Sequence, residues 1–217
     1  MRLIKHLNEE VKNGKWYAEE IRKNVAPSFR NAIHDVGNFL YRGTSRKIPE
    51  IETFSVRDDR RPFSTDLREH EIIDEIFNKK FGWKVRSNSV FASSNEFEAE
   101  VYGESYIFFP IKKYRFVWSP KVRDLWGTLG AIRKEVLAKR GIGIFSKRPH
   151  LARETWFIKE WIEGGELKKH FEPVIKQYTD KNLQQAIRQG VEVAFNCKNY
   201  FLVNRKYEDI LAEEFLD

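Results

Sequence analysis

The sequence has almost no cysteine and no long apolar run, and each absence excludes a class of protein. Cys197 is the only cysteine among the 217 residues, which excludes an internal disulfide framework and a zinc site built from cysteines. No run approaches the roughly 18 apolar residues that a membrane span needs. The first residues, MRLIKHLNEEVKNGKWY, lack the apolar stretch of a signal peptide. We therefore expect a cytoplasmic protein with no membrane partner.

The familiar catalytic and metal-binding motifs are also absent. The sequence contains no GxxxxGK[ST] or GxGxxG phosphate loop and no GxSxG nucleophile motif. Its five histidines stand far apart, and none belongs to an HExxH pair, so we predict no metal site. Cys197 has no flanking signature of a nucleophile, and we interpret it as a structural residue in a turn between two strands.

Positive charge is the main compositional bias. Lysine and arginine number 39 against 32 aspartate and glutamate residues, a formal net charge of +7. A basic chain attracts polyanions, so nucleic acid is one predicted partner, although solubility alone explains the charge equally well. The basic residues are scattered and form no basic tail. The candidate contacts to a nucleic acid are Arg57, Arg60, Arg61 and Lys84.

Apolar periodicity and turn residues predict an α+β fold with a mostly antiparallel sheet. The strands do not alternate regularly with helices, as crossover connections between parallel strands would require. The predicted helices are 1–37 (broken at Pro27), 66–80, 96–103, 122–139, 151–170, 171–188 and 180–190. The predicted strands are 38–43, 88–94, 105–111, 114–120, 191–195 and 200–204, with a loop over 44–62 and a turn at 196–199.

This order predicts a single domain over residues 1–217 with an aromatic-rich core. Its parts are N-terminal helices (1–37), a sheet core (38–121 and 189–204) and a helical insertion (122–188). Asp66 is expected to cap the helix 66–80, with Glu69 completing a capping box. Pro173 is expected to mark a first helical turn, and Asp180 to cap a helix that ends at Gly190.

Three short strings each place a polar group among the apolar residues at a predicted strand end. They are Tyr41-Arg42-Gly43, Phe91-Ala92-Ser93-Ser94 and Val191-Glu192-Val193. Burying such a group without a partner costs about 1–3 kcal/mol or more. Taken singly, each group is explained as the solvent-facing residue of an alternating strand. Together they form a pattern that is typical of one family.

The set resembles the R-S-E class of ADP-ribosyltransferases, which use NAD. FLYRG at 39–43 resembles the arginine motif, and FASSN at 91–95, followed by EFEAEVYG, resembles the serine motif. The catalytic glutamate motif is represented by GVEVAFNCKNYFLVN at 190–204. The resemblance covers roughly 39–204, with the segment 122–188 as an insertion between the second and third motifs. The chain is also similar to uncharacterised bacteriophage proteins, which implies the host cytoplasm or a phage particle as its location.

The resemblance implies a distinct role for each of three residues within an NAD site. Arg42 would hold the NAD diphosphate or the adjoining ribose, and Glu192 would stabilise positive charge on the ribose as the nicotinamide bond breaks. Ser93 would orient Glu192 or the ribose. The resemblance assigns catalysis to Arg42, Ser93 and Glu192 and NAD contacts to Arg42, Gly43, Phe91, Ser93, Ser94 and Tyr102, with Phe91 or Tyr102 stacking on the nicotinamide. We expect the side chains of Arg42, Ser93 and Glu192 to line one pocket.

The sequence departs from the family pattern at two positions. Asn95 stands where the serine motif has its last serine, and Gly190 stands where arginine-modifying members have Gln or Glu. Arginine is therefore not favoured as the acceptor residue. The string Phe63-Ser64-Thr65 is an alternative serine motif, although its place after Pro62 indicates the entry to a helix.

Two functions follow from these patterns. The first is transfer of ADP-ribose from NAD to a macromolecular acceptor, either a protein or a nucleic acid. The second is a non-catalytic role, as a phage virion or assembly protein that contacts phage structural proteins, or as a nucleic-acid-binding protein that retains the transferase-like fold.

Overall fold

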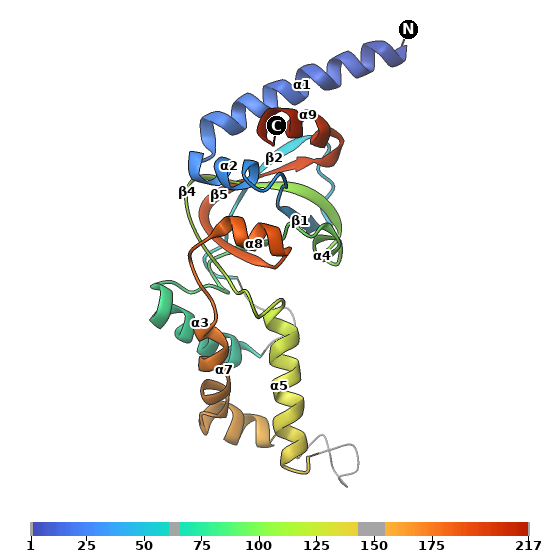
Figure 1. Ribbon diagram of the computed structural model, residues 1–217. Coiled ribbons are helices and arrows are strands. Elements are labelled where there is room, and N and C mark those ends of the chain that lie inside the picture. Colours follow the sequence, from blue (N-terminus) through green and yellow to red (C-terminus); the bar gives the residue numbers. More distant parts are fainter. Residues whose placement is uncertain (1, 61–65, 143–154, 217) are drawn as a thin grey trace. The chain divides into compact units, whose positions relative to one another are not determined.

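A computed structural model describes residues 2–60, 66–142 and 155–216 of the chain (Figure 1). The packing divides it into two compact units. We call residues 1–58, 89–119 and 179–217 the sheet unit, and residues 59–88 and 120–178 the helical unit. The helical unit thus combines most of the expected insertion, 122–188, with residues 59–88, which the sequence analysis assigned to the sheet core.

The sheet unit confirms the predicted α+β class with an antiparallel sheet. The strands are β1 (Tyr41–Thr44), β2 (Ile51–Ser55), β3 (Val90–Ala92), β4 (Glu104–Trp118) and β5 (Val193–Asn204). The strand order is β1-β4-β5-β2, with β3 paired to β5, and all pairings between these strands are antiparallel. The expectation of a continuous loop over 44–62 is wrong at residues 51–55, because these form β2, which pairs with the second half of β5.

The two longest strands differ from the expectation that each was a pair of shorter ones. The expected strands 105–111 and 114–120 form the single strand β4, which is interrupted by a bulge between Ile111 and Tyr114. Lys112, with φ 60°, occupies this bulge. The expected turn at 196–199 is also wrong, because β5 continues through it and Cys197 lies opposite Tyr114. Pairing along β4 outweighs the low strand propensity of the Asn-Cys-Lys-Asn segment.

Helices and the sheet share one apolar core. The helices of this unit are α1 (Arg2–Asn24), α2 (Pro27–His34), α4 (Glu96–Glu100), α8 (Leu183–Gln189), the 3₁₀ turn η2 (Arg205–Tyr207) and α9 (Glu208–Phe215). The break expected at Pro27 is confirmed, because Pro27 begins α2. Phe29 of α2 packs edge-on against Phe108, Phe109 and Phe195 in the centre of this core.

The helical unit contains α3 (Leu67–Phe81), α5 (Leu125–Lys139), the π-helix η1 (Phe157–Glu163) and α7 (Glu166–Lys176). Asp66 caps α3 as predicted, since its carboxylate accepts the backbone N–H groups of Arg68 and Glu69. The expected capping box is wrong, because the buried Glu69 carboxylate instead accepts bonds from Arg133 and Trp161.

Three further expectations for the helices after residue 150 are corrected. The continuous helices expected over 151–170 and 171–188 are replaced by η1, α7 and α8, and residues 151–154 lie outside the described part of the chain. Pro173 lies inside α7 rather than in a first turn. Asn182, not Asp180, precedes α8, and Gly190 ends this helix as expected.

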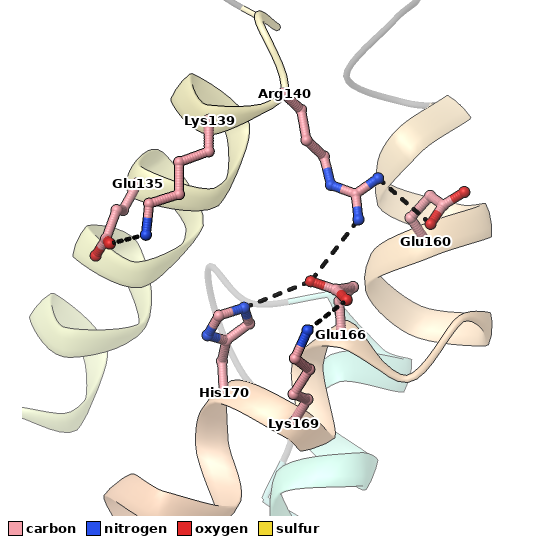
Figure 2. A network of polar contacts seen from close by, with 7 residues as sticks. All are labelled: Glu135, Lys139, Arg140, Glu160, Glu166, Lys169 and His170. Atoms are coloured by element: carbon pink, nitrogen blue, oxygen red, sulfur yellow. Dashed lines mark hydrogen bonds and ion pairs between the residues drawn. The ribbon is translucent and has the colours of Figure 1, made fainter.

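Ion pairs link the ends of helices in the helical unit (Figure 2). The Glu166 carboxylate, in the first turn of α7, lies within ion-pair distance of Arg140, Lys169 and His170. Arg140 also pairs with Glu160 at 3.4 Å. Exposed pairs of this kind contribute about 0–1 kcal/mol each, so they adjust the helix ends and do not hold the unit together.

Candidate functional site

Three strand ends that are far apart in the sequence meet in the sheet unit. Tyr41 of β1 and Ser93, just after β3, exchange both backbone hydrogen bonds, at 2.7 and 3.0 Å. The register of β3 on β5 ends with Ala92 opposite Val193, so the next residues of these two segments are Ser93 and Glu192. The backbone therefore brings the positions of Arg42, Ser93 and Glu192 together.

Arg42 is held by a backbone group and is half-buried. Its Nη1 atom donates to the carbonyl oxygen of Phe91 at 2.8 Å, which ties β1 to β3. A guanidinium carries five N–H donors in a fixed fork, so one bond to a neutral carbonyl leaves its charge and its geometry suited to a phosphate. Arg42 is thus the residue of this site that could hold an anionic ligand.

Ser93 is buried, and its hydroxyl joins two segments of the site. It donates to the carbonyl oxygen of Gly190 at 3.1 Å and accepts the backbone N–H of Asn95 at 3.0 Å. The neighbouring Ser94 hydroxyl donates to the carbonyl of Ile187. Both serines therefore bind the end of α8, and through it they position the segment that carries Glu192.

Glu192 lies between the end of α8 and the start of β5. Gly190 ends α8 in the left-handed region, with φ 63°, and Val191 is buried beyond it. Glu192 follows as a half-buried residue directly before β5. A side chain at Gly190 would be strained in this conformation. The glycine at position 190 thus has a structural reason, the way in which α8 ends.

Gly43 is required by the close approach of α4 to β1. A Cβ atom at this position would lie 1.8 Å from the carbonyl oxygen of Ala99 and 3.2 Å from Cβ of Tyr102. Any side chain would therefore push α4 away from β1. Of the two aromatic residues expected to stack on nicotinamide, Phe91 is half-buried and Tyr102 is 66% exposed.

The sequence analysis missed a chain of polar contacts beside the site. The hydroxyl of Tyr41 donates to Glu208 of α9 at 2.6 Å, and Arg205 pairs with both Glu208 and Glu96. Burial, together with the Glu208 carboxylate, raises the pKa of Tyr41 above its usual value. These contacts fix β1 between α9 and α4. No local pattern predicts them, because Glu208 and Arg205 follow the last motif.

The remaining candidate residues belong to one or the other unit or lie outside the described residues. Phe63-Ser64-Thr65 and Arg61 lie outside them. Arg57 belongs to the sheet unit, and Arg60 and Lys84 belong to the helical unit. Cys197 lies within β5 rather than in a turn, and burial raises the pKa of its thiol to about 12. A thiol with this pKa is inert at neutral pH, as expected of a structural cysteine.

Residues 2–60, 66–142 and 155–216 contain no group of three or more His, Cys, Asp or Glu side chains that could hold a metal ion. Within the same ranges, no helix has both the length and the apolar character needed to cross a bilayer.

Comparisons with protein-family models, with curated proteins and with solved structures give no match to this chain.

Proposed function

We propose that this protein transfers ADP-ribose from NAD to a macromolecular acceptor and that its sheet unit is an ADP-ribosyltransferase-like domain. The observation that supports the proposal is the meeting of Arg42, Ser93 and Glu192 at neighbouring strand ends. These residues are separated by 51 and 99 positions in the sequence.

Arg42 binds the diphosphate of NAD in this proposal. Its guanidinium is anchored by the Phe91 carbonyl, so the side chain loses little further freedom when it pairs with a phosphate. Because the anchor is neutral, it does not compete with the phosphate for the positive charge of Arg42. The main contribution of Arg42 is therefore to the binding of NAD rather than to the chemical step.

Glu192 acts on the bond that breaks. The bond between C1′ of the ribose and the nicotinamide nitrogen breaks, and its electron pair leaves with neutral nicotinamide. The ribose gains oxocarbenium character, which a nearby carboxylate stabilises. The acceptor nucleophile then bonds to C1′, and its proton passes to solvent water. Ser93 positions Glu192 through the carbonyl of Gly190, and it does not react.

Release of nicotinamide from NAD tests the proposal. Glu192→Gln is nearly isosteric, so the variant should fold while its turnover falls at least about 100-fold, as is typical when an electrostatic partner of the transition state is lost. Glu19→Gln, at an exposed position on α1, is the matched control and should retain full turnover. Circular dichroism confirms that both variants are folded.

Two results would contradict the proposal. Equal turnover of wild type and Glu192→Gln would remove Glu192 from the chemistry. No release of nicotinamide, combined with oligonucleotide binding that weakens steeply as salt rises, would favour the alternative of a non-catalytic nucleic-acid-binding protein.

A further inference from the structure

Apolar side chains are exposed in α4 and directly after its end. Phe97 and Val101 are each 78% exposed, and Tyr102 is 66% exposed. Phe97 and Val101 are four residues apart, so they lie on the same helical face. Single exposed apolar residues are common, but a group of three on one short segment is typical of a binding surface. We call Phe97, Glu98, Glu100, Val101 and Tyr102 the α4 face.

The α4 face borders the candidate NAD site at both of its ends. Tyr102 lies next to Gly43, the residue after Arg42, with its Cβ 3.2 Å from where a Cβ of residue 43 would be. At the other end of the helix, Asn95 lies beside Gly190, two residues before Glu192. Figure 1 shows α4 running beside β1 in the sheet unit. A molecule bound to the α4 face is therefore adjacent to the strand ends that carry Arg42 and Glu192.

The charge of this segment is opposite to that of the whole chain. Residues 96–104, EFEAEVYGE, contain four glutamates and no lysine or arginine, whereas the chain carries a net charge of +7. Arg205 neutralises Glu96, and Glu104 accepts the hydroxyl of Tyr106 at 2.7 Å. Glu98 and Glu100 flank the exposed apolar side chains. Their negative charge repels a phosphate backbone and attracts lysine or arginine side chains.

We propose that the α4 face docks the acceptor and that the acceptor is a protein presenting basic side chains around an apolar one. The inference rests on the proposed function, and it chooses a protein over a nucleic acid as the acceptor. Exposed aromatic and apolar side chains provide the contact area that dominates protein interfaces, and the surrounding charges select the partner. The exposed apolar side chains form the docking surface, and the glutamates indicate that the protein bound there is basic.

The test is a selection that needs no NAD. The immobilised full-length protein is presented with a displayed library of random peptides and, separately, with a pool of random single-stranded oligonucleotides. The wild type should enrich peptides with lysine or arginine around an aromatic or aliphatic residue. The double variant Phe97→Ser/Val101→Ser should lower this enrichment at least tenfold, and Glu98→Lys/Glu100→Lys should remove the preference for basic residues.

Matched controls change exposed residues elsewhere. Ile158→Ser, at a residue that is 56% exposed in the helical unit, controls for loss of an apolar side chain. Glu19→Lys controls for a change of charge on an exposed helix position. Both should enrich the same peptides as the wild type.

Each outcome decides the inference. Peptides without basic residues, enrichment that survives Phe97→Ser/Val101→Ser, or no enrichment at all would overturn it. Oligonucleotide binding that the same double variant weakens would also overturn it, because the occupant would then be a nucleic acid. Release of nicotinamide is measured in parallel. Peptide binding without nicotinamide release would contradict the proposed function but leave the docking surface standing. Nicotinamide release without peptide binding would contradict the docking surface but leave the proposed function standing.

Discussion

The buried Glu69 of the helical unit and the candidate-site residues of the sheet unit find their hydrogen-bond partners in different ways. In the helical unit, the fully buried Glu69 carboxylate accepts bonds from two side chains, Arg133 at 2.6 Å and Trp161 at 2.8 Å. In the sheet unit, Arg42 and Ser93 bond to backbone carbonyls at the strand ends.

This difference separates a structural cluster from a candidate site. Opposite charges that bond to each other cancel, and neither remains for a ligand. A guanidinium that donates to a neutral carbonyl is fixed in place while its charge is kept. The proposed function therefore belongs to the sheet unit, although the buried side chains of Glu69, His70 and Asp74 lie in the helical unit. Three substitutions test this comparison, in order of decreasing effect.

The largest effect is expected from Arg133→Leu in the helical unit. It leaves the Glu69 carboxylate, which is 0% exposed, with only the Trp161 indole as a partner. Breaking one side of a buried pair typically costs about 3–5 kcal/mol. The free energy of unfolding, measured by denaturant titration, should fall by this amount, whereas nicotinamide release per folded molecule should stay unchanged.

A double variant separates charge from packing. Glu69→Gln/Arg133→Leu removes both charges and keeps an acceptor for Trp161, so it should lose much less stability than Arg133→Leu alone. Equal losses in the two variants would show that packing around Arg133, and not the buried charge, holds this part of the unit. Loss of nicotinamide release in folded Arg133→Leu would contradict the separation of structure from function.

A smaller effect is expected from Gly43→Ala in the sheet unit. The added Cβ would lie 1.8 Å from the Ala99 carbonyl, and forcing such a group into a packed site costs about 1–3 kcal/mol. Gly130→Ala is the control, since its Cβ would meet nothing within 4 Å inside α5. This control should be neutral or gain up to about 1 kcal/mol. Thermal melting that ranks the two variants in the opposite order would exclude close packing of α4 on β1.

The smallest effect concerns pH and His70. Burial, reinforced by the positive charge of Arg86 and opposed by Asp74, lowers the pKa of His70 below its unfolded value of about 6.5. The unfolded chain therefore binds the proton first, and stability falls as the pH drops below about 6.5. Each unit of difference in pKa is worth about 1.4 kcal/mol. His70→Gln should flatten the dependence of the free energy of unfolding on pH below about 6.5. If the slope in this range is unchanged in the variant, the loss of stability in acid is due to groups other than His70.

The strand ends that carry the three motifs could be predicted because their signals are local. Each motif is a short apolar string that holds a polar residue and lies beside a glycine or a helix cap. Asn95 caps α4 just after β3, and Gly190 ends α8 just before β5, so the backbone changes conformation within a few residues of each motif. Glycine stops and helix caps depend on local backbone conformation, so they can be recognised in the sequence without knowing the fold.

The rest of the fold depends on long-range pairing, which these signals do not contain. Asn196 and Lys198 favour a turn by type, yet they lie within β5 because β4 continues beside them. β2 was missed for a similar reason, since its alternation is short and follows Pro49. The grouping of residues 59–88 with 120–178 rests on side-chain packing, including the pair of Glu69 and Arg133.

Thermal melting with and without NAD tests the central claim most directly, because it reads binding separately from chemistry. NAD at about 100 times its dissociation constant stabilises the folded protein by about 2.7 kcal/mol, a shift of several degrees for a chain of this size. Wild type should show this shift, and Glu192→Gln should largely keep it, because Glu192 acts on the charge that develops during bond cleavage. Arg42→Ala should abolish it, while the control Arg46→Ala, at an exposed arginine paired with Glu52, should retain it. No shift for the wild type, or an equal shift for Arg42→Ala, would contradict an NAD site at these strand ends.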